Sequence, residues 1–247
     1  MDKTGINIDI ERYWREGFLT VPGVLSTQQL GEMRAESDRL MQVCYQERER
    51  YARRIEWEVD HLAEENRTGM EKAIRKLEPI SDLSAIFKDL AFSPAITAPI
   101  STIFNEPVGL FEDKLNLKLP GGSPYPWHQD WVCCWKAHTD QLITCFIYLD
   151  DADEVNGCLQ VLPRSQQGKP ILPYKAGGRF EVDPACVDQN KVLPVPLKAG
   201  EMIFFDPYLL HYSDLNRSKS PRRAIIYTYH PARLGKINEG RFPADFS

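Results

Sequence analysis

Residues 201–230 read EMIFFDPYLLHYSDLNRSKSPRRAIIYTYH, and this stretch decides the fold. Its two ends, EMIFFD and RAIIYTYH, are short apolar runs rich in aromatic and β-branched residues, which is typical of buried strands. The polar run at 216–221 between them, NRSKSP, predicts a turn. If the flanks of this turn pair as an antiparallel hairpin, Arg222 returns to lie beside His211.

Similar short runs recur through the second half of the chain. Pro, Gly, Asn and Asp separate them, and no helical period of useful length survives after residue 110. Many short strands joined by turns predict an all-β sandwich or barrel. The runs are VGLFEDKLNLKL at 108–119, LITCFIYLD at 142–150, CLQVLP at 158–163 and KVLPVPL at 191–197.

The first hundred residues have a helical character instead. A helix is expected to start at residue 9 and stop at Gly17, before a strand at 18–21. Ser26 and Gln29 form a capping-box pattern, and the helix that follows is expected to run to about residue 65. Further helices are expected within residues 81–93, capped by Ser81 or Asp82, and within 93–104.

The second half of the long predicted helix, residues 46–68, is densely charged with both signs interleaved. Such a pattern is typical of a solvated helix face, and a lid over a site is the alternative. No linker, repeat or low-complexity tract divides the sequence. We therefore expect one domain over 1–247, with a mainly helical part at 1–105, a β core at 106–232 and a tail at 233–247.

Composition narrows the function classes. The formal charge of -5 provides no electrostatic footprint for nucleic acid or an anionic membrane, so a small-molecule partner is expected. The six cysteines show no CxxC spacing, which favours free thiols in a reducing compartment. No apolar leader or membrane-length stretch is found, and a cytoplasmic monomer or homodimer is expected.

Trp127-His128-Gln129-Asp130 carries the first candidate ligands. His128 and Asp130 are two residues apart, a spacing that places both side chains on one face of an extended strand. With His211 from a distant strand they form the two-histidine, one-carboxylate set that suits non-haem Fe(II). Of the other histidines, His61 and His230 are expected to have surface or core roles. A zinc site at His138 with Cys133 and Cys134 is not favoured, because adjacent cysteines chelate one ion with poor geometry and no second pair completes the site.

Arg222 is expected to point inward, because Ala224 and Ile226 share its face of a regular strand while Arg223 points away. Its guanidinium is shaped for bidentate binding of a carboxylate. Ser213, two residues after His211, lies on the same face as that ligand and is a candidate to share the carboxylate.

These residues resemble the phytanoyl-CoA dioxygenase family of Fe(II)/2-oxoglutarate oxygenases. The resemblance covers most of the chain, and His128, Asp130, His211 and Arg222 are its most specific positions. It is carried by REGFLTVPGVLS at 15–26, WHQD at 127–130, NGCLQVLPRSQQG at 156–168 and AGEMIFFDPYLLHYSDLNRSKSPRRAI at 199–225.

The resemblance implies a double-stranded β-helix, a cupin-like jelly roll at 106–232, with helices packed outside. It implies that His128, Asp130 and His211 bind Fe(II) and that Arg222 holds the distal carboxylate of 2-oxoglutarate. Further contacts to this co-substrate are implied for residues near the triad. They are Ser213, Asn116, Gln129, Lys118 and Phe146.

The implied reaction uses O₂ and converts 2-oxoglutarate into succinate and CO₂ while an unactivated C–H bond of a small metabolite is oxidised. Because related halogenases replace the carboxylate ligand with a small residue, Asp130 favours hydroxylation or desaturation. Two alternatives use other chemistry. One is a cupin-like metal-dependent isomerase or lyase that needs no 2-oxoglutarate, and the other is a non-catalytic binding module on the same scaffold.

Overall fold

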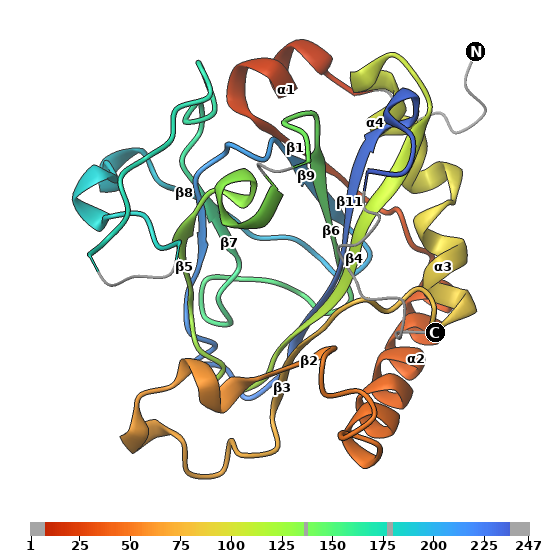
Figure 1. The fold of residues 1–247 in the computed structure, drawn as a ribbon, viewed down its shortest axis with the longest axis vertical. Coiled ribbons are helices and arrows are strands. Elements are labelled where there is room, and N and C mark those ends of the chain that lie inside the picture. The colour runs from red at the N-terminus through yellow and green to blue at the C-terminus, as the bar shows by residue number, and fades with distance from the viewer. Residues whose placement is uncertain (1–7, 136–137, 177–179, 238–247) are drawn as a thin grey trace.

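Two antiparallel sheets face each other in the computed structural model, which describes residues 8–135, 138–176 and 180–237 (Figure 1). The major sheet has the order β1 (Phe18–Val21), β9 (Met202–Phe205), β6 (Ile143–Tyr148), β11 (Arg222–Pro231), β4 (Val108–Lys118), β3 (Ile74–Leu77) and β2 (Ile55–Trp57). The minor sheet has the order β5 (Tyr125–His128), β10 (His211–Ser213), β7 (Leu159–Val161) and β8 (Leu193–Val195). The expected mainly-β sandwich is confirmed.

The two-residue period of β11 explains how the layers form. Ala224 packs between the sheets with Phe205 and Leu159, while Ile225 and Tyr227 point to the outer face, toward the helices. The Tyr227 hydroxyl donates a 2.6 Å hydrogen bond to the carbonyl of Phe87, so the buried phenol keeps a partner. Each strand therefore supplies one face to the interior of the sandwich and one to the helical layer.

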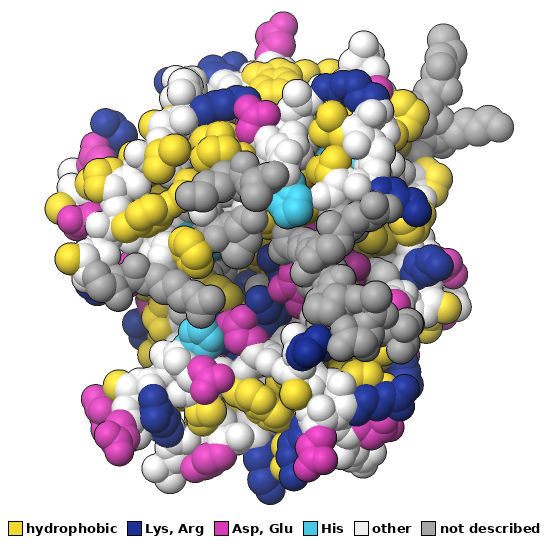
Figure 2. Space-filling view, in the orientation of Figure 1, with side chains coloured by type: hydrophobic (Ala, Val, Ile, Leu, Met, Phe, Trp, Pro, Cys, Tyr) yellow, Lys and Arg dark blue, Asp and Glu magenta, His cyan; other side chains and the backbone are white. Residues whose placement is uncertain are grey.

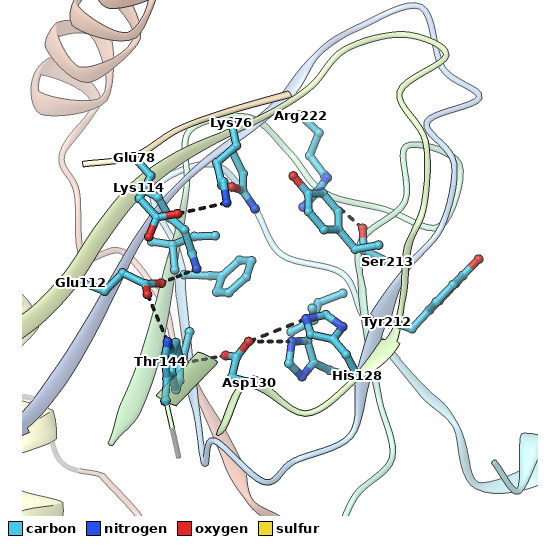
Figure 3. Close-up of a pocket in the computed structure, with 17 residues that line it drawn as sticks. Lys76, Glu78, Glu112, Lys114, His128, Asp130, Thr144, Tyr212, Ser213 and Arg222 are labelled. Carbon is cyan, nitrogen blue, oxygen red and sulfur yellow. Dashed lines mark hydrogen bonds and ion pairs between the residues drawn. The ribbon is translucent and has the colours of Figure 1, made fainter. Parts of the chain in front are cut away.

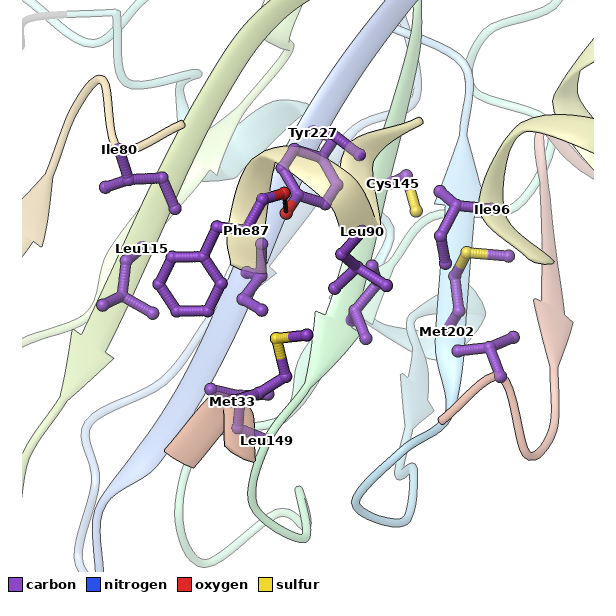
Figure 4. Close-up of a cluster of buried hydrophobic side chains, with 14 of the residues drawn as sticks. Met33, Ile80, Phe87, Leu90, Ile96, Leu115, Cys145, Leu149, Met202 and Tyr227 are labelled. Atoms are coloured by element: carbon purple, nitrogen blue, oxygen red, sulfur yellow. Dashed lines mark hydrogen bonds between the residues drawn. The ribbon is translucent and has the colours of Figure 1, made fainter. Parts of the chain in front are cut away.

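Helices cover the outer face of the major sheet. They are α1 (Ile10–Glu16), α2 (Thr27–Gln46), α3 (Ala85–Ala91) and α4 (Pro94–Phe104). Figure 4 shows Phe87, Leu90 and Ile96 packed against side chains of the sheet such as Leu115. None of the described helices is long and apolar enough to cross a bilayer.

The capping box of α2 is confirmed: the backbone N–H of Gln29 donates to the Ser26 hydroxyl, and the Gln29 side chain accepts from the Ser26 N–H. The expected end of this helix near residue 65 is wrong, because α2 stops at Gln46. Beyond it, Ile55 and Trp57 of the charged run pack against the core from a strand and not from a helix. The expected α3 cap is also wrong, since Ser84 caps that helix.

The chain after α2 enters the major sheet as β2 and β3, which the sequence did not predict (Figure 1). Ile55 and Leu77 are buried, and Leu77 pairs with Leu115 of β4. The side chain of Arg54 makes a 2.5 Å ion pair with Asp82. Strands from residues 1–105 thus extend the sheet that the later strands form.

The predicted hairpin of His211 and Arg222 is wrong. β10 pairs with β5 and β7 in the minor sheet, whereas β11 pairs with β4 and β6 in the major sheet. The turn at 216–221 therefore carries the chain from one sheet to the other. Arg222 approaches Ser213 across the interior of the sandwich. Residues 238–247 of the expected tail lie outside the described residues.

Candidate metal centre

His128, Asp130 and His211 converge between the two sheets. His128 is the last residue of β5 and pairs directly with His211, the first residue of β10. The Nε2 atoms of His128 and His211 lie 3.6 and 3.7 Å from Asp130 Oδ1. One possible ligand atom from each residue lies within 4.8 Å of the others, which is the spacing of donors around a single metal ion.

Contrary to the sequence prediction, Asp130 does not lie on an extended strand with His128. The strand ends at His128, and Asp130 stands at the start of the helical turn that continues as a π-helix over Trp131–Trp135. The shared-face argument for an extended strand is therefore wrong in its geometry. The turn still brings the carboxylate back toward the imidazole.

Neighbouring backbone and side-chain groups orient all three side chains. Nδ1 of His128 lies 2.6 Å from the carbonyl of Pro126, and Nδ1 of His211 lies 2.9 Å from that of Leu209. These contacts favour protons on Nδ1 and leave both Nε2 atoms facing Asp130. The Thr144 hydroxyl donates a 2.8 Å hydrogen bond to Asp130 Oδ2.

The protonation states suit a cation. Burial, reinforced by the proximity of His211, lowers the pKa of His128 to about 3, so its imidazole is neutral at pH 7. Burial opposes ionisation of Asp130, but His211 and His128 outweigh it and lower the pKa of this carboxyl. A neutral imidazole beside an ionised carboxylate is the form in which these groups bind metals.

Arg222 lies in the same cavity and is 2% exposed. Its Nη2 donates a 3.3 Å hydrogen bond to the Ser213 hydroxyl. Among the described residues it forms no ion pair, and its Nε has no hydrogen-bond partner. A buried guanidinium without an anion is costly, so this part of the cavity is built to receive one.

Of the other residues predicted to contact the co-substrate, two line the cavity and two lie outside its lining. Asn116 and Phe146 line the cavity, and Asn116 Oδ1 is buried without a hydrogen-bond partner in the described part of the chain. Lys118 lies behind Ser213, donating a 2.7 Å hydrogen bond to its hydroxyl. Burial, then the charges of Arg222 and Arg75, lowers the pKa of Lys118 to about 5.

The side chain of Gln129, which was expected to contact 2-oxoglutarate, forms hydrogen bonds with the protein backbone. Its amide nitrogen donates to the carbonyls of Tyr208 and Pro170 at 2.7 and 3.0 Å, and its oxygen accepts from the N–H of Leu172 at 3.2 Å. The side chain thus holds the 170–172 segment beside the ligand strand. This placement does not favour a direct contact between Gln129 and the co-substrate.

The cavity has a volume of about 210 Å³ and includes residues that sequence reasoning missed. Figure 3 shows four of them on the side opposite Arg222 and Ser213: Lys76, Glu78, Glu112 and Lys114. The face of the molecule in Figure 2 is hollowed near its centre, and basic and acidic side chains lie side by side in the hollow. The other missed lining residues include Tyr125 and Thr144.

Polar alternation in the segment 112–116 was the available signal, because Glu112, Lys114 and Asn116 share one strand face. Of these three residues, only Asn116 was predicted to lie in the site. Of the aromatics near the ligands, Trp135 lines the cavity, whereas the ring of Trp131 stacks on Tyr208 with centroids 4.8 Å apart.

Comparison with known proteins agrees with this geometry. The family model described as phytanoyl-CoA dioxygenase (PhyH) matches residues 13–224. A methylphosphonate hydroxylase from Gimesia maris is 28% identical over 97% of this chain and 86% of its own length. A 2-aminoethylphosphonate dioxygenase from an uncultured bacterium is 27% identical over 71% of this chain and 64% of its own length.

Solved structures share the architecture. EvdO2 from Micromonospora carbonacea var. aurantiaca, complexed with 2-oxoglutarate, has a TM-score of 0.69 and 23% identity over 94% of each chain. This likeness, with the two antiparallel sheets and the outer helices, confirms the predicted jelly roll.

Proposed function

Because this chain belongs to the phytanoyl-CoA dioxygenase family of Fe(II)/2-oxoglutarate-dependent dioxygenases, we propose that His128, Asp130 and His211 are its iron ligands. We propose in addition that Arg222 and Ser213 bind the distal carboxylate of 2-oxoglutarate. The protein is an enzyme that uses Fe(II) and 2-oxoglutarate to hydroxylate a small metabolite. The residue assignments are the part that needs testing.

One observation carries the assignment of Arg222: a guanidinium that is 2% exposed and lacks an ion pair among the described residues shares a cavity with the ligand triad. The far carboxylate of a dicarboxylate provides the missing charge. Asn116 lines the same cavity, and its amide group carries N–H donors for an anionic ligand. The donor set therefore fits both the metal and the co-substrate.

When bound, iron and 2-oxoglutarate supply the oxidising chemistry, with O₂ consumed, succinate and CO₂ released, and a C–H bond of the substrate hydroxylated. The side chains of this protein position the reactants. Thr144 holds Asp130 in one orientation, and Phe146 and Ile226 give the cavity an apolar wall that limits water near the reacting centre.

The test compares two adjacent arginines. Arg222→Met should raise the KM for 2-oxoglutarate at least about tenfold, because a buried bidentate contact is worth more than about 1.4 kcal/mol. Arg223 points outward to Asp150 and Asp38, so Arg223→Met should keep the affinity for 2-oxoglutarate. Succinate formation is the readout, with Fe(II) titrated into each variant.

The same assay tests the triad. His128→Ala and Asp130→Ala should abolish Fe(II)-dependent succinate formation, since two remaining ligands do not hold the metal. Full turnover in either variant would remove these residues from the metal site. Unchanged kinetics in Arg222→Met would remove the arginine from the co-substrate site.

We further infer a cytoplasmic location and a monomer or homodimer that binds neither nucleic acid nor membranes. The support for the compartment is chemical: the cysteines that the structure describes, Cys44, Cys145, Cys158 and Cys186, are free thiols. Cell fractionation tests the location, and light scattering of the purified protein tests the oligomeric state.

A further inference from the structure

We propose that the substrate is a small zwitterion, in which a carboxylate or phosphonate and an ammonium group are separated by a few carbon atoms. Its binding surface is the charged wall, which we define as Lys76, Glu78, Glu112 and Lys114. This inference rests on the proposed function. It assigns to the substrate the part of the cavity that iron and 2-oxoglutarate do not fill.

Strand register places the four charges in an alternating arrangement. Lys76 of β3 pairs with Asn116 of β4, and Leu77 pairs with Leu115. Continuing this antiparallel register by one residue sets Glu78 opposite Lys114. Lys114 therefore lies between Glu112 on its own strand and Glu78 on the neighbouring one, with opposite charges adjacent in both directions.

Ion pairs already hold the wall together. Lys76 Nζ lies 3.0 Å from Glu78 Oε2, and Lys114 pairs closely with Glu112. The indole N–H of Trp135 donates a 3.1 Å hydrogen bond to Glu112 Oε2. In Figure 3 the wall stands across the cavity from Arg222, with Asp130 below and between them.

The wall is too buried for ordinary surface charge. The side chains of Lys76, Glu78, Lys114 and Glu112 are 24%, 13%, 18% and 0% exposed. Against the effect of burial, Glu78 and Glu56 raise the pKa of Lys76, which keeps this group charged. Burying four charges beside a reaction centre costs free energy, and an apolar lining of the same shape would avoid that cost. A substrate with a long apolar chain would gain nothing from four buried charges, so this lining does not favour such a substrate.

Charge balance selects a zwitterion over a simple ion. An anion placed on Lys114 comes close to Glu112 and Glu78, so one negative charge stays uncompensated in a buried site. A cation placed beside Glu112 or Glu78 comes close to Lys114, so one positive charge stays uncompensated. A ligand with one ammonium and one carboxylate or singly ionised phosphonate places an anion beside a lysine and a cation beside a glutamate, and adds no net charge.

The spacing limits the size of this zwitterion. The two signs of the wall are in contact, with Lys76 Nζ 3.0 Å from Glu78 Oε2, so a ligand that meets both must carry its own two charges only a few carbon atoms apart. The cavity of about 210 Å³ must also hold the co-substrate, which leaves room for a molecule of amino-acid size. One relative is named for a zwitterion of this size, 2-aminoethylphosphonate, and another for an anion, methylphosphonate.

The experiment uses probes matched in shape and different in charge. The zwitterions are 2-aminoethylphosphonate, L-proline and β-alanine. Their partners are the anions ethylphosphonate, cyclopentanecarboxylate and propionate, and the cations ethylamine and pyrrolidine. Each probe is added to the enzyme with Fe(II), 2-oxoglutarate and O₂, and the rate of succinate formation is measured. At least one zwitterion should stimulate the rate tenfold more than its matched ions.

Variants then locate the effect. Lys76→Met and Glu78→Gln should raise the KM for the stimulating zwitterion at least tenfold and leave the KM for 2-oxoglutarate unchanged. The matched controls, Lys72→Met and Glu65→Gln, change exposed residues of the preceding segment and should alter neither constant. Thermal melting of each variant shows that it folds.

The possible failures are distinguishable. If the visible absorption band of the anaerobic Fe(II)–2-oxoglutarate complex does not form, the proposed function fails. If that band forms but a matched anion or cation stimulates as strongly as the zwitterion, the substrate inference is overturned. It is overturned equally if none of the zwitterions stimulates succinate formation above the level without a probe.

Discussion

Arg222 and Arg223 are adjacent in sequence and have opposite environments. Arg222 is buried in the cavity with a single hydrogen bond to Ser213, while Arg223 binds Asp150 and Asp38 on the outside of the sheet. The two-residue period of β11 produces this difference. The charge of Arg223 is paired within the fold, and we propose that the charge of Arg222 binds the co-substrate.

Thr144 gives a first prediction at the scale of single residues. Thr144→Val keeps the side-chain shape and removes the hydroxyl that donates to Asp130. Because such outer contacts orient metal ligands, we expect about a 10- to 100-fold loss of metal affinity. Anaerobic calorimetry with Fe(II) measures it, and Thr97→Val in α4, where the hydroxyl binds only the Ser93 carbonyl, is the control. Equal affinities in the two variants would contradict this role.

Lys118 gives a second prediction, on pH. Its pKa in the folded protein, about 5, lies below the value of about 10.4 for an unfolded chain. Between these two pH values Lys118 is protonated in the unfolded state and neutral in the folded state. The contribution of Lys118 therefore makes the free energy of unfolding rise with pH, and Lys118 destabilises the folded protein most near pH 5.

Burial is the main cause of this low pKa, and a dicarboxylate beside Arg222 offsets the smaller contribution of the positive charges. Binding of 2-oxoglutarate slightly above pH 5, where Lys118 titrates, should therefore take up protons onto this side chain. Calorimetry in buffers of different ionisation enthalpy measures that uptake, and Lys118→Met should abolish it. Identical binding enthalpies in all buffers for the unaltered protein would count against the assignment.

β10 shows how a strand of three residues can be held in place. His211 and Ser213 have partners on both sides, in β5 and β7. The Ser213 hydroxyl also donates a 2.7 Å hydrogen bond to the carbonyl of Gly157. This short element thus holds the proposed metal ligand His211 and the proposed co-substrate residue Ser213 together, and its position depends on the close approach of the 157 backbone.

Gly157 provides the prediction for this element. Its φ is +74°, and a Cβ there would collide with the carbonyl oxygen of Asp214. Gly168 has a similar φ of +73° with open space around it. Gly168→Ala should lose only the conformational cost, about 1–2 kcal/mol.

Gly157→Ala should lose about 3 kcal/mol or more, because the strand end must also move. Urea unfolding compares the two variants. The 2-oxoglutarate affinity should fall in Gly157→Ala alone. Equal stability of both variants would show that the contact with Asp214 has no energetic role.

The two sheets act as one unit around the cavity. The proposed metal ligands His128 and His211 lie on the neighbouring strands β5 and β10 of the minor sheet, and Arg222 and the charged wall belong to the major-sheet side of the cavity. Arg75 of β3 pairs with buried Glu58 at 3.0 Å, and the N–H of Ser123 donates to the same carboxylate at 2.7 Å. These contacts tie the β2–β3 segment to the strand that carries His128.

A ligand that bridges both sheets should therefore stabilise the whole fold. With Fe(II) and 2-oxoglutarate at about a hundredfold their Kd, each adds about 2.7 kcal/mol and raises the Tm by roughly 5–10 °C. Anaerobic thermal melting measures the shifts. Arg222→Met should keep the metal shift and lose the 2-oxoglutarate shift. Loss of both shifts would mean that Arg222 supports the metal site itself.

The amino-acid sequence alone was enough to predict the fold class, most of the strands after residue 106 and the candidate chemistry. Two-residue alternation fixed the faces of β11, with Arg222 inward and Arg223 outward. The spacing of residues 127–130 and the position of His211 identified the candidate ligands. These are properties of short segments, and steric and hydrophobic rules for single elements suffice to predict them.

Only the tertiary structure decided which strands pair. It placed His211 and Arg222 in different sheets, turned the charged residues after Gln46 into a strand pair, directed the Gln129 amide to the 170–172 segment and assembled Lys76 with Lys114. Alternation tells which way a side chain points, and hydrogen bonding to a distant strand decides what it meets. That choice depends on non-local burial of whole faces, a quantity that no short stretch of sequence contains.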